Sequence, residues 1–213
     1  MFPRGVFGGT DRRPVETVNW YHTIAFCNKL SLTKGKEPVY RVNGVGNWEG
    51  LAYNAIPTSS DKDWDNAVWD TVKNGFRLPT EMEWTWAAMG AADSTNDPGY
   101  TKAFAESTKN AGIGDYAWYD ANSGYKTHEV GGKAANELGL RDMSGNVWEW
   151  CWDWYGDYPA GEQTDYTGPN QGLYRVIRGG GWFNFASYCT LATRNYAGPE
   201  LRNYDLGFRV VCF

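Results

Sequence analysis

With 213 residues, of which 42% are hydrophobic, the chain is long enough to form one domain around a substantial core, and its 12 Trp, 14 Tyr and 26 Gly favour loop-rich structure packed by aromatic rings. Its 20 basic and 25 acidic residues give a net charge of −5, which excludes the cationic surface that nucleic acid or anionic lipid would require. No apolar run approaches the roughly 20 residues of a membrane-spanning helix, so no direct membrane span is expected, and residues 1–4 do not resemble a signal peptide.

The first predicted element is a helix that begins after Asn19. Residues 1–13 are rich in Gly and Arg and are expected to form a loop ahead of it. Asn19 is a favourable N-cap, and apolar residues recur at helical spacing over residues 20–30. His22 and Asn28 fall outside this apolar stripe. His22 is one of only 2 histidines and is expected at the surface, without a catalytic role.

A second helix is predicted in the middle of the chain. It follows a short strand over residues 39–42 and a long irregular segment over residues 43–75, of a kind that often serves function. Thr80 and Glu83 match a capping box, in which the side chain of each residue binds the backbone amide of the other, so the helix begins after Thr80. Residues 90–138 are again expected to form loops because they are rich in Gly, Asn, Asp and Ser.

Tryptophan occupies every second position from residue 148 to residue 154, the strongest period in the chain. Side chains on an extended strand alternate between two faces, so the indoles are expected to share one face of a core strand. The opposite face is expected to carry Val147, Glu149, Cys151 and Asp153. The sequence therefore predicts an aromatic wall that other structure must cover. Residues 174–178 then begin a final block of short strands.

Three blocks of sequence together resemble one known family. They are residues 77–84 (RLPTEMEW), residues 139–150 (GLRDMSGNVWEW), and a final block from RGGGW at 178–182 to LGFRVV at 206–211. In this order they closely resemble the formylglycine-generating enzymes, also called sulfatase-modifying factors. The helix that begins after Asn19 resembles the same family.

This resemblance covers nearly the whole chain from about residue 14. It implies an α+β, C-type-lectin-like fold with two helices, small antiparallel sheets and extensive irregular loops, as a single domain over residues 1–213. The family's usual N-terminal segment is missing, so a shortened version of the family's chain is expected. The fold does not decide the function, because the same scaffold hosts oxidases, iron enzymes and pure binding proteins.

An oxidase of this family would depend on Cys189. Family members use a cysteine pair in the final block to hold copper, and Cys189 matches the first of the two, but the remaining cysteine of this region, Cys212, lies in the terminal strand. A lone thiolate would need a cation such as Arg194 to lower its pKa, and a buried structural thiol is the competing interpretation. The 4 cysteines show no spacing for zinc, and disulfides stay open. The 2 histidines do not provide the cluster that iron enzymes of the superfamily need. No catalytic residue is therefore expected.

A binding function explains the final block better. Its candidate ligand-binding residues are Phe183, Asn184, Phe185, Tyr188, Thr193, Asn195, Tyr196, Leu201, Asn203, Tyr204 and Asp205. All are residue types that an AAC codon gives when its adenines are replaced by any base, and Lys, Gln, Glu, Met and Trp, which such a codon cannot give, are absent from these positions. The pattern resembles the variable proteins of diversity-generating retroelements. The resemblance implies a variable region over about residues 178–211, an unknown protein or glycan ligand, and display at a bacterial cell surface.

The enzyme family also implies a structural calcium site, and no other cofactor is required. Asp142, the carbonyl groups of Gly145 and Val147, and Glu149 occupy the matching positions, and calcium prefers such oxygen ligands. The competing interpretation is a turn in which Asp142 binds local amides and Glu149 forms an ion pair.

Overall fold

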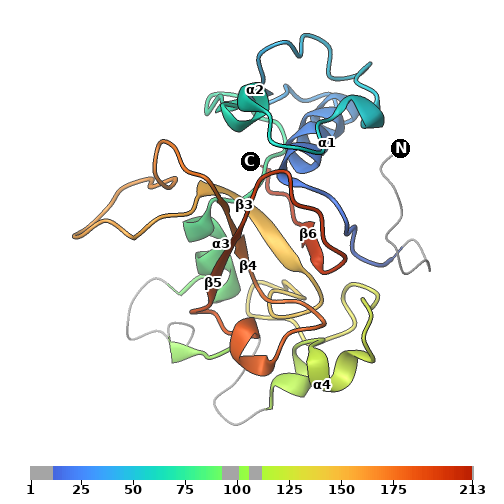
Figure 1. Ribbon diagram of the computed structural model, residues 1–213. Coiled ribbons are helices and arrows are strands. Elements are labelled where there is room, and N and C mark those ends of the chain that lie inside the picture. Colours follow the sequence, from blue (N-terminus) through green and yellow to red (C-terminus); the bar gives the residue numbers. More distant parts are fainter. Residues whose placement is uncertain (1–11, 93–100, 106–111, 213) are drawn as a thin grey trace.

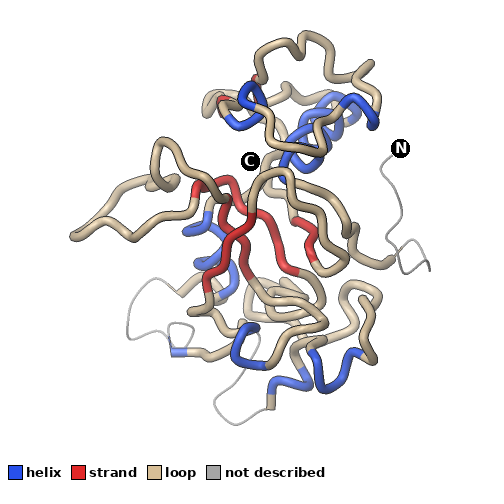
Figure 2. The backbone as a smooth tube through the Cα atoms, viewed as in Figure 1, coloured by secondary structure: helices blue, strands red, loops and turns tan. Residues whose placement is uncertain are grey.

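The computed structural model describes residues 12–92, 101–105 and 112–212. Almost all of the predicted N-terminal loop lies outside these residues. The helices in the described part are α1 (Trp20–Thr33), α2 (Lys62–Asp65), α3 (Glu81–Ala88) and α4 (Asp120–Ser123). Two of them, α1 and α3, are the helices expected from sequence, whereas α2 and α4 are single turns inside segments expected to be irregular. Most of the chain is loop, as Figure 2 shows. The described residues contain no helix that combines the length and apolar character needed to cross a membrane.

A four-stranded sheet forms the centre of the molecule (Figure 1). Its strands are β3 (Trp148–Trp154), β4 (Arg175–Arg178), β5 (Arg194–Ala197) and β6 (Leu206–Phe208), in the order β5-β4-β3-β6. The expectation of antiparallel sheets holds for β3-β4 and β4-β5, but β6 runs parallel to β3. The reason is the connection over residues 198–205, which carries the chain back along the sheet before β6 begins. A separate antiparallel pair joins β1 (Tyr40–Arg41) to β2 (Val68–Trp69).

Both long helices begin as their sequences predict. The Asn19 side chain accepts a hydrogen bond from the backbone amide of His22 at 2.9 Å. At the start of α3, Thr80 and Glu83 form the complete capping box, with distances of 3.1 and 2.9 Å. Caps of this kind satisfy amides that the helix itself leaves unpaired. α3 packs against β3 and β4 (Figure 1).

The surface position expected for His22 is wrong, because His22 is buried, and Asn28, which also falls outside the apolar stripe, is buried as well. The segment over residues 43–75 folds back over α1 and covers the helix face that would otherwise meet water. Tyr53 from this segment stacks on the His22 ring, with 4.5 Å between centroids. The Asn28 side chain accepts a hydrogen bond from the Tyr40 amide at 3.0 Å and donates one to the Tyr40 carbonyl at 2.8 Å. It therefore forms the hydrogen bonds that a neighbouring strand would otherwise form with β1.

The alternation predicted for β3 is confirmed, and it separates two parts of the core. Trp148 and Trp150 belong to a cluster that includes α1, whereas Cys151 packs with Trp84 of α3 on the other face of the sheet. The outer end of the aromatic wall encloses Arg175, whose guanidinium lies 3.5 Å from the centroid of the Trp154 ring. The two faces of one strand therefore join both helices to the sheet.

Candidate ligand-binding surface

The final block presents large side chains to solvent. Between 47% and 68% of each is exposed in Phe183, Phe185, Tyr188, Tyr196, Leu201 and Tyr204. They lie in the loops on either side of β5 or, for Tyr196, on β5 itself, which is an edge strand of the sheet. Exposed aromatic side chains gathered in one region are typical of interaction surfaces.

Buried Trp182 supports one group of these residues. Its ring centroid lies 5.6 Å from that of Phe183 and 5.8 Å from that of Tyr204, and its indole nitrogen donates to the Tyr204 carbonyl at 3.1 Å. Tyr125, which follows α4, adds a ring 6.4 Å from Phe183 and is 64% exposed. These four residues are called the Trp182 cluster below. Sequence analysis missed Tyr125 because it lies far outside the final block.

A second group surrounds Tyr196 on β5. Its ring centroid lies 4.6 Å from that of Tyr155 and 4.8 Å from that of Tyr174, and these two residues flank the long loop between β3 and β4. Tyr204 lies two residues before β6, at the opposite edge of the sheet. The predicted ligand-binding residues therefore make two groups of ring contacts, each of which includes rings from outside the final block.

Two of the predicted ligand-binding residues contact the scaffold. The Asn184 side chain accepts hydrogen bonds from the Trp148 indole at 2.7 Å and from the Gly181 amide at 2.9 Å, so its polar oxygen holds the loop to β3. Asp205 is only 8% exposed, and its carbonyl accepts the Trp148 amide at 2.7 Å. Burial raises the pKa of the Asp205 carboxyl. Asn184 is half-buried and Asp205 is buried, and both are partners of the start of β3.

The remaining polar positions are half-buried and bind neighbouring groups. The Thr193 hydroxyl donates to the Ser187 carbonyl at 2.9 Å. The side chains of Asn195 and Asn203 each accept the backbone amide of the following residue at 2.9 Å. These contacts order the backbone on which the exposed rings are mounted.

Glu81, the first residue of α3, fixes β5 to the scaffold. Its carboxylate is buried and accepts two hydrogen bonds from Arg194 of β5, at 2.6 and 2.7 Å. Tyr158 donates to the same carboxylate at 3.0 Å, and the Arg178 guanidinium lies 3.4 Å away. A bidentate pair of this kind sets orientation as well as distance. The edge strand β5 is thus held by residues of α3, β4 and the loop that follows β3.

The arrangement around Cys189 does not activate its thiol. Cys189 is fully buried, and burial raises the pKa of its thiol to about 12, so the thiol is protonated at neutral pH. Arg194, the expected activating cation, is bound to Glu81 instead. Cys212 is exposed and contacts the Asn74 carbonyl at 3.6 Å, and none of the four cysteines forms a disulfide.

The residues of the implied calcium site do not fit the ion as they are arranged. Both oxygens of the buried Glu149 carboxylate accept hydrogen bonds from Arg209, at 2.6 and 2.7 Å. The same guanidinium donates to the carbonyl groups of Arg141 and Asp142, at 3.2 and 3.3 Å, and thus takes the place that a cation would occupy. One oxygen of Asp142 accepts a hydrogen bond from the Gly131 amide at 2.7 Å, and the other has no hydrogen-bond partner among the described residues. Burial raises the Asp142 pKa, and the negative charge of the nearby Glu149 adds to the increase.

Neither histidine belongs to a metal centre within the described residues, which contain no group of three or more metal-ligating side chains. Burial lowers the pKa of His22 to about 4, so this ring is neutral at physiological pH. His128 stacks on Trp118 with 3.8 Å between centroids and contacts the Ser123 carbonyl through its Nε2 atom at 2.7 Å. Both rings are packing elements.

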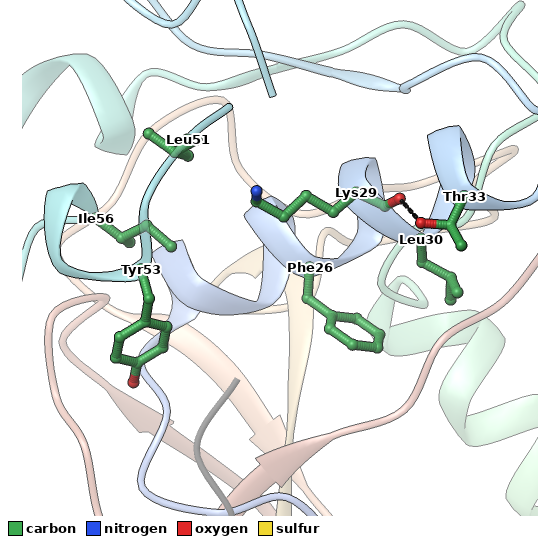
Figure 3. Close-up of a pocket in the computed structure, with 7 residues that line it drawn as sticks. All are labelled: Phe26, Lys29, Leu30, Thr33, Leu51, Tyr53 and Ile56. Carbon is green, nitrogen blue, oxygen red and sulfur yellow. Dashed lines mark hydrogen bonds between the residues drawn. The ribbon is translucent and has the colours of Figure 1, made fainter. Parts of the chain in front are cut away.

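A hollow beside α1 is a poor ligand site (Figure 3). It measures about 220 Å³, and Phe26, Leu30, Leu51 and Ile56 make its lining largely apolar. The Lys29 ammonium group donates to the Glu49 carbonyl at 2.9 Å. The volume lies below the roughly 300–1,000 Å³ typical of small-molecule pockets, and few polar groups could orient a ligand.

Comparison with known proteins places this geometry in context. The family described as sulfatase-modifying factor enzyme 1-like domains matches residues 3–212 of this chain. The chaperone protein LppX of Paenibacillus barcinonensis is 33% identical over 235 residues, which cover 98% of this chain and 72% of that protein. The formylglycine-generating enzyme of Thermomonospora curvata is 35% identical over 158 residues, covering 68% of this chain and 52% of the enzyme.

Solved structures of similar proteins share the fold. Treponema denticola variable protein 1 has a TM-score of 0.87 and 46% identity, and the match covers 99% of this chain and 74% of that one. CarF has a TM-score of 0.69 and 28% identity, covering 94% of this chain and 67% of that one. These likenesses confirm the small α+β, C-type-lectin-like architecture expected from the sequence.

Proposed function

This chain belongs to the family of sulfatase-modifying factor enzyme 1-like domains, and from that premise we propose that it binds a ligand through its exposed aromatic surface and catalyses no reaction. The residues of that surface are diversified by a retroelement, and the protein is displayed at a bacterial cell surface. The ligand is a protein or a glycan. The likeness to Treponema denticola variable protein 1 supports this function over that of the enzymes in the family.

One observation supports the proposal most strongly. The exposed aromatic side chains belong to backbone segments that contacts with the core hold in place. Trp182 supports Phe183 and Tyr204 from below, and Asn184 ties the same loop to β3. Aromatic side chains offer a large contact area with few rotatable bonds, so little conformational entropy is lost when a ligand binds. Exchange of the exposed residues would then change the ligand without disturbing the core.

Two matched libraries test this separation of surface from scaffold. The first randomises Phe183, Phe185, Tyr188, Tyr196, Leu201 and Tyr204 with codons that end in C. The control library randomises other exposed apolar residues with the same codons, namely Leu32, Val68, Met82, Trp86, Val130 and Leu138. Both are displayed and selected against one panel of immobilised proteins and glycans. The proposal expects binders from the first library with retained stability, and equal yields from the two libraries would refute it.

The competing oxidase function depends on Cys189 and is tested separately. The protein is incubated with copper and a cysteine-containing sulfatase peptide, and conversion of the cysteine is followed by mass spectrometry. A buried thiol with a pKa near 12 predicts no turnover. Turnover that is lost in Cys189→Ser would instead establish the oxidase and overturn the binding proposal.

A further inference from the structure

A polar hollow is lined by other residues than the aromatic surface described above. It is formed by β2, the segment that leads into α3, and residues 165–167 of the long loop between β3 and β4, which is orange in Figure 1. Its volume of about 520 Å³ falls within the roughly 300–1,000 Å³ typical of small-molecule sites. None of the predicted ligand-binding residues lines it.

The cations in this hollow already have carboxylate partners. Arg77 forms two hydrogen bonds to Glu83, each 2.6 Å long, and its guanidinium stacks 4.5 Å from the centroid of the Trp69 ring. Lys73 forms an ion pair with Glu37. An anion such as phosphate would have to compete with these carboxylates for each cation, so the charges do not favour an anionic ligand.

The other groups in the wall suit a ligand rich in hydroxyl groups. Trp69 and Tyr166 supply aromatic surface, and Thr71, Thr167 and Asp165 supply two hydroxyls and a carboxylate. Hydroxyls both donate and accept hydrogen bonds, and a carboxylate accepts from two directions. The rings in turn pack against the C–H groups of a sugar ring, which is polar at its rim and apolar on its faces.

The loop that carries Asp165 and Thr167 is held close to the sheet. Gly168 has a φ of +86°, and a Cβ atom there would lie 2.8 Å from the Cβ atom of Asp153 on β3. No other residue type could approach the strand so closely in this conformation. Both sides of the hollow are therefore fixed before a ligand arrives, because Arg77 and Glu83 hold the opposite side.

From this lining we infer that the hollow is a second binding site, which takes a neutral saccharide independently of the aromatic surface and without calcium. Its ligand is small, of one or two sugar rings. A fixed saccharide site next to a diversified surface would leave one recognition property constant while the other changes.

Saturation-transfer-difference NMR tests the site. The probes are methyl glucoside, methyl galactoside, methyl mannoside, N-acetylglucosamine, maltose and cellobiose, measured in EDTA, with inorganic phosphate and sulfate as anionic competitors. At least one saccharide is expected to receive saturation, with no displacement by either anion. Asp165→Ala combined with Thr167→Val is expected to weaken binding at least tenfold, because it removes a carboxylate and a hydroxyl from the wall. Both residues are exposed, so their loss leaves the core intact.

Tyr196→Ser serves as the control, since Tyr196 is also exposed but lies at the aromatic surface. It is expected to leave saccharide binding unchanged. The inference is overturned if no probe binds, if phosphate or sulfate displaces the saccharide, or if the double variant binds as the parent does. A loss of saccharide binding in Tyr196→Ser would also overturn it, because the two surfaces would then be one.

Discussion

Replacement of Glu81 by Gln tests how the edge strand is attached to the scaffold. Gln keeps the volume of the side chain but removes the charge that two arginines face. The Glu81 side chain is 3% exposed and that of Arg194 is 18% exposed, so water cannot replace the lost partner. Breaking a buried ion pair on one side costs about 3–5 kcal/mol, because the remaining charge stays buried without compensation.

The expected loss in the free energy of unfolding is therefore about 3 kcal/mol, since the Gln carbonyl still accepts one hydrogen bond. For a domain of this size that loss corresponds to a decrease in Tm of roughly 6–12 °C. Urea unfolding followed by circular dichroism gives the free energy, and a thermal scan gives the Tm. Glu37→Gln is the matched control because it breaks the exposed pair with Lys73, and an exposed pair contributes little to the free energy of unfolding.

A double-mutant cycle with Arg194→Met identifies the partner. If Glu81 acts through Arg194, the two substitutions together should cost less than the sum of their separate effects by more than about 1 kcal/mol. The reasoning is refuted if Glu81→Gln costs no more than Glu37→Gln. It is also refuted if the effects of Glu81→Gln and Arg194→Met simply add.

Three further predictions concern titration, thiols and metal binding. Burial raises the Asp153 pKa to about 7 from an unfolded value near 3.8, so the folded state binds the proton more tightly and the free energy of unfolding falls as pH rises through this window. Asp153→Asn should remove this fall, which is up to about 1.4 kcal/mol per pH unit. Urea unfolding of the variant and the wild type at pH 4 to 7.5 measures the difference. Iodoacetamide at neutral pH should label exposed Cys212 in the folded protein and leave Cys189 unmodified, as peptide mass spectra would show. Labelling of Cys189 at a similar rate would contradict its burial. Because Arg209 occupies the Glu149 carboxylate, millimolar calcium and EDTA should give the same Tm, whereas a rise in Tm with calcium would show that the ion displaces the guanidinium.

Local patterns predicted those parts of the fold that local forces determine. The tryptophan period of β3 and the capping box of Thr80 and Glu83 involve residues close together in sequence, and both are confirmed. The apolar stripe of α1 alone predicts His22 at the surface. Its burial depends on Tyr53, and that of Asn28 on β1, so later segments cover a second face of the helix.

The candidate surface shows the same division. The sequence identified a set of residue types, and many of their large side chains are exposed. It could not show that Asn184 binds Trp148, 36 positions earlier in the chain, or that Asp205 pairs with the start of β3. Tyr125 joins Phe183 only through the fold. Such contacts between distant segments have no signature in a single sequence.

Sequencing of this gene and its flanking DNA from many cells of one population tests the central claim most directly. The account predicts substitutions concentrated at the exposed positions between residues 183 and 204, matched to adenines in a nearby template copy. The supporting residues Trp148, Trp182 and Glu81 should stay constant. If the exposed positions prove as constant as these three, the surface is not diversified, and the account is contradicted.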